Sequence, residues 1–155
     1  MVLEWFVQTF GYLGIFIASA VMTANILIPY PATIISFVGG AAFNPLLVGI
    51  SAGLGAAIGE LTGYGLGYGG KKILLKKMKK SILKKQWTKT KKAFHKHGGL
   101  LIFFMAVTPL PDDLLGMFCG ATHYDVKKFL FFAAAGKIVL YTIFAVTGNT
   151  IFSFV

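Results

Sequence analysis

Two related stretches decide the fold of this chain: Ile28-Pro29-Tyr30-Pro31-Ala32-Thr33-Ile34-Ile35 and Thr108-Pro109-Leu110-Pro111-Asp112-Asp113-Leu114-Leu115. Each one places two prolines, separated by a single residue, in the middle of an apolar segment. Proline removes a backbone donor and collides with the preceding helical turn, so neither segment is expected to form one straight helix. When the two proline pairs are aligned, Gly40-Ala41 falls on Gly120-Ala121. The matched breaks indicate an internal repeat.

The composition is typical of a membrane protein. Of the 155 residues, 56% are hydrophobic and 13% are charged, whereas about a quarter are charged in a soluble domain. The net charge is +10, and twelve of the fifteen lysines lie between Lys71 and Lys96. A nucleic-acid binder would need its basic face on a soluble fold, so we expect no nucleic-acid partner. The single cysteine, Cys119, excludes an internal disulfide.

We expect one membrane domain over residues 1–155, divided into four parts. Residues 1–22 should form a first transmembrane helix, because Trp5 to Met22 is eighteen residues without a charge, close to the minimum for crossing the hydrocarbon core. Residues 23–70 form repeat 1, a broken hairpin plus a transmembrane helix, and residues 99–155 form repeat 2 in the same way. Four glycines spaced four apart line one face of the first repeat's helix: Gly55, Gly59, Gly63 and Gly67. This spacing favours close packing within one chain over a homo-oligomer face, which is the alternative.

Residues 71–98 connect the two repeats. Lysines alternate there with apolar residues at roughly helical spacing, which predicts an amphipathic helix at the membrane surface. The positive-inside rule places this helix on the cytoplasmic side of a multi-pass cell-membrane protein, where its lysines attract anionic lipid headgroups. Simple topological anchoring is the alternative role.

Lysine placement also predicts how the second break is threaded. Lys127 and Lys128 follow it closely and should lie on the same side as residues 71–98. Residues 99–122 then enter and leave on one side, as two limbs of about ten residues and some 15 Å each. If the first break behaves likewise from the opposite face, the fold is an all-α inverted repeat of two re-entrant helical hairpins. With three residues dropped from the loop, Gly59-Glu60 falls on Gly136-Lys137, and Tyr64 falls on Tyr141.

Four ionisable residues in apolar surroundings form the predicted site: Glu60, Asp112, Asp113 and Lys137. Facing lipid, they would cost about 10 to 14 kcal/mol together, so we expect them to meet near the midplane, where inverted repeats place substrate and ion sites. Lys137 would pair with a substrate phosphate or an acid, and the carboxylates would bind protons or cations. A structural ion network is the alternative, and either aspartate could be the one that caps a half-helix. The remaining predicted residues are the hairpin breaks Pro29, Pro31, Pro109 and Pro111 and the supporting residues Asn25, Thr33, Thr108, Tyr64 and Tyr141.

The sequence gives no sign of an enzyme, a metal site or a cofactor. No serine, cysteine or histidine is placed in a nucleophile and base pattern. His95 and His97 stand in a solvated lysine run without a nearby thiol or carboxylate, so we expect no metal there.

The chain resembles the DedA family, also known as the VTT domain or SNARE-associated Golgi protein family, from about Gly11 to Gly148. The resembling residues are the first break with Gly39-Gly40, the run Gly59-Glu60-Leu61-Thr62-Gly63-Tyr64 with Gly67 and Gly70, the stretch Phe104-Met105-Ala106-Val107-Thr108-Pro109, and Gly120 leading to Phe129 and Gly136. The resemblance implies two facing re-entrant hairpins and the transport of polyprenyl phosphates or phospholipids, coupled in bacteria to ion gradients. It also implies a functional role for Glu60. Two departures are Thr33, where many bacterial relatives have an acid, and Ala106, where they have an arginine.

The leading hypothesis is therefore a flippase or scramblase of a phosphate-bearing lipid. A proton- or cation-coupled carrier of a small soluble solute is the first alternative. A non-transporting membrane scaffold is the second.

Overall fold

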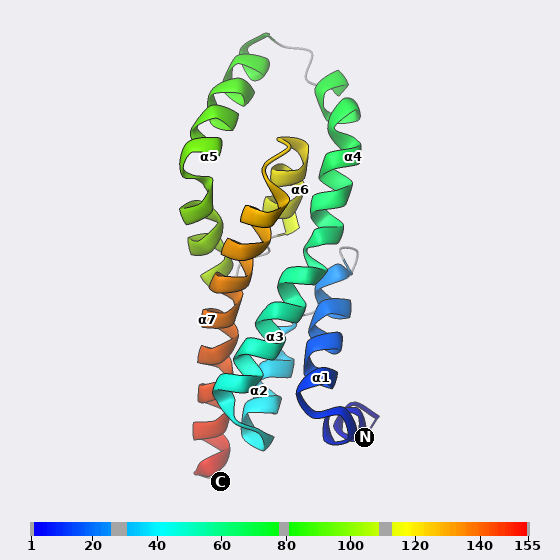
Figure 1. Ribbon diagram of the computed structural model, residues 1–155, viewed down its shortest axis with the longest axis vertical. Helices are drawn as coiled ribbons and strands as arrows, with labels where there is room; N and C mark the ends of the chain where they lie inside the picture. The colour runs from blue at the N-terminus through cyan, green and yellow to red at the C-terminus, as the bar shows by residue number, and fades with distance from the viewer. Residues whose placement is uncertain (1, 26–30, 78–80, 109–112, 155) are drawn as a thin grey trace.

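The fold is known from a computed structural model, which describes residues 2–25, 31–77, 81–108 and 113–154 (Figure 1). These residues are almost entirely helical and contain no strand. The helices are α1 (Val2–Ala24), α2 (Thr33–Ala42), α3 (Pro45–Gly59), α4 (Leu61–Lys77), α5 (Ser81–Val107), α6 (Asp113–Ala121) and α7 (Val126–Ser153). The all-α prediction is confirmed for this part of the chain.

Two helical stretches in the described residues are long and apolar enough to cross a membrane: Pro45–Ile73, with 29 residues, and Val126–Ser153, with 28. At 1.5 Å per residue each is about 42 Å long, against a hydrocarbon core of about 30 Å. The first stretch combines α3 and α4, because Glu60 N–H donates to Ala56 O and Tyr64 N–H donates to Glu60 O, both at 3.0 Å. Figure 1 shows α4 continuing α3 with a change of direction.

Helices α2 and α6 are too short to span a membrane. They have ten and nine residues, or about 15 and 13 Å. Both follow a predicted break, and they lie toward opposite ends of the long axis (Figure 1). Of the break prolines, Pro29, Pro109 and Pro111 lie outside the described residues, and Pro31 is exposed just before α2.

Helix α2 touches α7 through backbone atoms. A Cβ added to Gly40 would lie 2.1 Å from the carbonyl oxygen of Ala145, and one added to Gly148 would lie 2.0 Å from that of Phe37. No larger residue fits either position without moving a helix. The absence of side chains at these two positions is therefore what allows α2 to lie directly on the C-terminal half of α7.

Helix α6 touches α4 in a closely similar way. A Cβ on Gly120 would lie 1.9 Å from the carbonyl oxygen of Tyr64, and one on Gly67 would lie 1.9 Å from that of Met117. The two sets of contacts occur at a nearly constant spacing in the sequence. In the short helices, the contacting residues of α6 follow those of α2 by 80 positions (40 and 120, 37 and 117). In the long helices, the contacting residues of α7 follow those of α4 by 81 positions (64 and 145, 67 and 148). The contacts favour an offset of 81 between the long helices, one helical turn more than the 77 of the sequence alignment.

The turns before the two long helices also match. The Oδ1 atom of Asn44 accepts from the backbone N–H groups two and three residues later, at 3.0 and 3.4 Å. That of Asp125 accepts from the equivalent groups at 2.9 and 3.0 Å. Both side chains cap a helix N-terminus, and the offset that relates the long helices also relates Asn44 to Asp125.

The glycine stripe packs within the chain, as the spacing predicts. A Cβ on Gly55 would lie 2.1 Å from the carbonyl oxygen of Phe16 in α1, and one on Gly59 would lie 2.5 Å from that of Ala20. Gly67 meets α6, as described above. The described glycines of the stripe thus bring both α1 and α6 onto the first long helix.

The start of the chain differs from the expected straight helix over 1–22. Helix α1 is kinked at Gly11, which has φ 53° and ψ −128°, a conformation that glycine adopts without steric penalty. Among the residues whose side chains are described, the apolar part of this helix covers Phe10–Ala24, about 22 Å. Figure 1 shows the residues before the kink turned aside.

The basic segment differs from the expected single helix over 71–98. Its residues are divided between the end of α4 and the start of α5, and residues 78–80 between them lie outside the described part. Helix α5 continues from the lysines into apolar sequence without interruption. In Figure 1 the basic parts of α4 and α5 project together at one end of the molecule.

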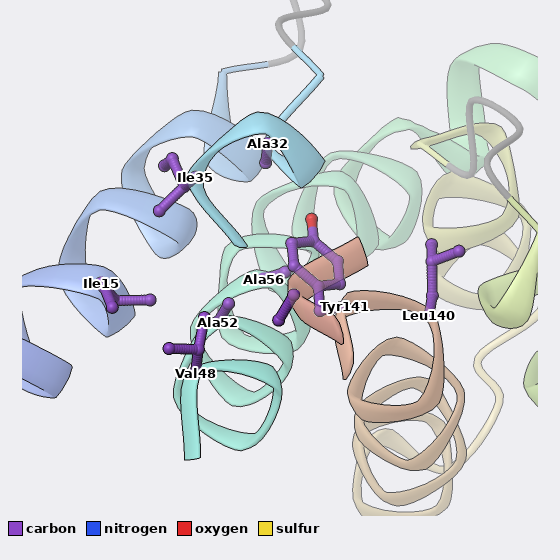
Figure 2. Close-up of a cluster of buried hydrophobic side chains, with 9 residues drawn as sticks. Ile15, Ala32, Ile35, Val48, Ala52, Ala56, Leu140 and Tyr141 are labelled. Carbon is purple, nitrogen blue, oxygen red and sulfur yellow. The ribbon is translucent and has the colours of Figure 1, made fainter. Parts of the chain in front are cut away.

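Two clusters of buried side chains form the core. The first joins α1, α2, α3 and α7 and is shown in Figure 2; it contains Ile15, Ala32, Ile35, Val48, Ala52, Ala56, Leu140, Tyr141 and Ala145. The second joins α3, α5, α6 and α7 and contains Ala57, Phe94, Ile102, Leu115, Cys119, Tyr124, Phe129 and Ala133. Many large apolar side chains remain exposed outside both clusters, as expected for a surface that faces lipid.

Candidate functional site

The structure brings Glu60 and Lys137 together as a buried ion pair. Lys137 Nζ lies 2.7 Å from Glu60 Oε1, and the side chains are 7% and 2% exposed. Glu60 stands close to the middle of the stretch Pro45–Ile73, and Lys137 stands close to the middle of Val126–Ser153. The pair therefore lies at a similar depth on both long helical stretches.

The ion pair lies between the two apolar clusters. On the first long helix, Ala56 belongs to one cluster and Ala57 to the other, about one helical turn before Glu60. On α7, Ala133 and Leu140 belong to different clusters and stand on either side of Lys137. Removing two charges from water costs several kcal/mol per ion, so a buried pair at this place carries a desolvation cost that its interactions have to offset.

Each charged residue follows a glycine that another helix touches. Gly59 meets α1 at Ala20, as described above. A Cβ on Gly136 would lie 2.6 Å from the carbonyl oxygen of Phe103 in α5 and 2.7 Å from the Cβ of Ala106. The two small residues let α1 and α5 approach the backbone directly beside the ion pair. The sequence predicted these two dipeptides as equivalent, and the structure places them at one site.

Three buried hydroxyls on α1 and α7 have no hydrogen-bond partner in the described structure: those of Ser19, Thr23 and Thr142. Thr23 is adjacent to the ion pair in the fold, because its Cβ would lie 2.9 Å from a Cβ placed on Gly59. Buried polar groups are almost always paired, so these hydroxyls provide unused hydrogen-bonding capacity. The sequence analysis missed all three; the spacing of Ser19 and Thr23, one helical turn apart in apolar sequence, was the available signal.

Two tyrosines flank the ion pair: Tyr64 follows Glu60 by one helical turn, and Tyr141 follows Lys137 by one helical turn. The hydroxyl of Tyr64 donates to the carbonyl oxygen of Tyr124, toward the turn between α6 and α7. Tyr141 is buried in the first cluster, and Figure 2 shows its hydroxyl directed toward the side on which Ala32 precedes α2. The two predicted supporting tyrosines therefore extend from the pair in opposite directions.

The aspartates of the predicted site are not placed. Asp112 lies outside the described residues, and only the backbone of Asp113 is described, at the start of α6. Their participation stays a prediction. Of the supporting residues, Asn25 is exposed after α1, Thr33 begins α2 and its carbonyl accepts from Ser36 Oγ, and Thr108 Oγ1 donates to Met105 O at 2.7 Å.

Comparison with known proteins gives the family. The family model of the VTT domain matches residues 28–150, a range that contains both proline breaks, both long helical stretches up to their last turn and both members of the ion pair. No curated protein and no solved structure matches the chain. The matched range covers most of the sequence, and the chain therefore belongs to the VTT-domain family, which includes DedA and the SNARE-associated Golgi proteins.

Proposed function

We propose that this protein is a transporter that moves a phosphate-bearing lipid, a polyprenyl phosphate or a phospholipid, from one leaflet of the cell membrane to the other. The observation that carries the proposal is the buried Glu60–Lys137 pair midway along two helices long enough to span the membrane. Ionisable residues at that depth are costly and mark substrate or ion pathways by default. Membership of the VTT-domain family supports the same conclusion.

The proposed architecture is an inverted repeat of two re-entrant hairpins. In this proposal α2 and α6 are the second limbs, and the C-terminal parts of α1 and α5 are the first limbs. The matched glycine contacts at offsets of 80 and 81 support it, as do the matched helix caps. The two long helical stretches run in opposite directions (Figure 1), as inversion requires.

In the proposed mechanism the substrate phosphate exchanges with Glu60 as the partner of Lys137. Glu60 takes up a proton or a cation when it is displaced, so that the buried charge stays balanced. Ser19 and Thr23 supply hydroxyl donors on the adjacent face of α1. The phosphate leaves to the other leaflet when the hairpins shift, and Glu60 returns to Lys137.

The proposal includes the orientation of the protein. The basic ends of α4 and α5, with Lys127 and Lys128, lie on the cytoplasmic side and contact anionic headgroups. In this proposal the protein carries out no covalent chemistry.

The test is transport in liposomes that contain the purified full chain. Fluorescent phospholipid and polyprenyl phosphate are the probes, with a small soluble solute as a third arm. We expect wild-type protein to move at least one of the lipids, and Glu60→Gln and Lys137→Ala to abolish this movement. The matched control is Thr147→Ala, which removes an exposed polar side chain from the same helix as Lys137.

Folding is checked for each variant by its elution profile and helical content. If a single variant unfolds, Glu60→Met/Lys137→Met restores an apolar contact and must still lose transport. Wild-type activity in the double variant would contradict the midplane site. Movement of the solute without either lipid would support the coupled-carrier alternative, and movement of none of them would support a scaffold.

A further inference from the structure

A row of polar aromatic residues on α4 leads away from the ion pair. Tyr64, Tyr68 and Lys71 stand at positions i+4, i+8 and i+11 relative to Glu60, a spacing that places all four on one helix face. The rings of Tyr64 and Tyr68 are stacked with centroids 6.4 Å apart. Beyond them, the ring of Tyr68 lies 4.2 Å from the ring of His123. The row connects the middle of the long helix to its basic end.

His123 is held at the point where three elements meet. It lies in the turn between α6 and α7 and has φ 55°, a value that few residues other than glycine adopt. On one side it contacts Tyr68 of α4. On the other side, His95 of α5 places Nε2 3.2 Å from the carbonyl oxygen of Thr122. The turn is thus fixed between α4 and α5, with an imidazole exposed at the junction.

The junction concentrates positive charge. Lys71 stands one helical turn after Tyr68, and Lys91 stands one turn before His95. Both lysines therefore lie on the helices that hold the turn of His123. Desolvation, and then the ammonium groups of Lys71 and Lys91, lower the pKa of His123. The acid nearest to His123 in the sequence is Asp125, and its carboxylate already accepts two backbone N–H groups at the start of α7. An anion at the junction would offset the positive charge of Lys71 and Lys91.

Exposed apolar side chains stand at the level of Lys71 on α4: Tyr68 shares its helix face, and Leu66 and Ile73 face the other way. Leu66, Tyr68 and Ile73 are 57%, 53% and 65% exposed. A free anion gains nothing from this apolar surface, whereas a lipid can place its headgroup on the lysines and its acyl chains along the helix. The combination favours a lipid over a soluble anion.

We propose that Lys71, Lys91 and His123 form a binding site for the phosphate headgroup of a membrane lipid, from which the Tyr68–Tyr64 row leads to the Glu60–Lys137 pair. This inference rests on the proposed function for the destination of the lipid. The binding site itself is separate from the ion pair, so it can be measured without transport.

The first experiment compares lipid binding by two double variants. The full chain in detergent is titrated with phosphatidic acid, and bound lipid is counted by native mass spectrometry. Since each lysine near a headgroup contributes about 1 kcal/mol, we expect Lys71→Ala/Lys91→Ala to bind about tenfold more weakly or worse. The matched control, Lys85→Ala/Lys89→Ala, removes the same charge from exposed positions nearer the start of α5. It should change the affinity less than about twofold, because these lysines are not part of the proposed site and attraction between charges weakens with distance. Equal losses in both variants would overturn the site.

The second experiment uses wild-type protein, so it does not depend on the folding of a variant. Histidine side chains are labelled and followed by NMR while phosphatidic acid is added. The resonances of His123 and His95 should shift, while those of His97, another exposed side chain of α5, should not. Inorganic phosphate serves as a second probe. If millimolar phosphate produces the same shifts, or if all three histidines shift alike, the lipid site is wrong.

Binding and transport can fail separately. Selective phosphatidic acid binding without lipid movement in liposomes would contradict the proposed function and leave the headgroup site standing. Lipid movement in liposomes without selective phosphatidic acid binding would contradict the headgroup site and leave the proposed function standing.

Discussion

The α2–α7 and α4–α6 contacts are built alike, while the centres of the long helices are not. In both contacts a glycine of the short helix meets a carbonyl oxygen of the long one, and a glycine of the long helix meets a carbonyl oxygen of the short one, at positions offset by 80 and 81. At the centre, the offset that relates the long helices pairs Glu60 with Tyr141 and Lys137 with Ala56. The duplicated features hold the helices together. Among the described residues the buried charges are not duplicated, so the two halves differ where the ion pair lies.

The two ends of the molecule also differ in their charge. The α4–α6 end adjoins the lysines of α4 and α5, whereas at the α2–α7 end the uncharged Asn149 donates to the carbonyl oxygen of Gly40 at 3.0 Å. The two ends are therefore packed alike and charged differently. Each of the following predictions is a way to break or sharpen this comparison.

The largest effect is expected at the centre. Lys137→Met leaves Glu60 buried without its cation and should lower the free energy of unfolding by about 3 to 5 kcal/mol. Glu60→Met/Lys137→Met removes both charges and should recover most of that loss. Urea unfolding in detergent, followed by circular dichroism, measures both. A double variant as unstable as the single one would show that the pair is not what matters at this position.

The next effect is expected at the duplicated contacts. Gly40→Ala and Gly120→Ala each push a Cβ into a carbonyl oxygen of the neighbouring helix, which should cost about 1 to 3 kcal/mol or more. Gly65→Ala is the matched control, because nothing lies within 4 Å of a Cβ there, and its higher helix propensity should leave stability equal or slightly raised. A harmless substitution at one of the two contacts would break their equivalence.

A smaller effect is expected at the helix caps. Asn44→Ala removes the acceptor for two backbone N–H groups and should lower the free energy of unfolding by about 1 kcal/mol. Asp125→Ala should lower the thermal midpoint in the same direction. Thr147→Ala serves as the control, since its exposed hydroxyl bonds only within its own helix and its loss should change stability by less than about 0.5 kcal/mol.

The smallest effect distinguishes the two caps by pH. The backbone N–H of Lys128, with that of Lys127 and both ammonium groups, holds the pKa of Asp125 below its usual value. A lowered folded-state pKa stabilises the fold above the unfolded pKa, and the contribution is lost as the pH falls below about 4. The thermal midpoint of wild-type protein should therefore fall more between pH 7 and pH 3 than that of Asp125→Asn. Asn44→Asp should introduce the same dependence at the other cap, and parallel curves for all three proteins would refute this.

Much of the site was predictable because depth follows from helical rise. Counting residues from the lysines places Glu60 and Lys137 at similar depths, and the cost of lipid exposure requires both to face protein. The hydroxyls of Ser19, Thr23 and Thr142 were not predictable in this way, because serine and threonine can satisfy their hydroxyls within their own helix. Only the packed structure shows that these three do not.

The sequence by itself determined the helical class, the interruption of two apolar segments, the glycine face and the charged residues that have to be buried. These properties depend on composition, on proline and on periodicity, which act within a few residues of each other. The tertiary structure decided the rest: the kink at Gly11, the division of the basic segment between α4 and α5, and the 2.7 Å contact between Glu60 and Lys137. A residue's depth and face are local properties, whereas its partner on a distant helix depends on how closely the helices can approach one another.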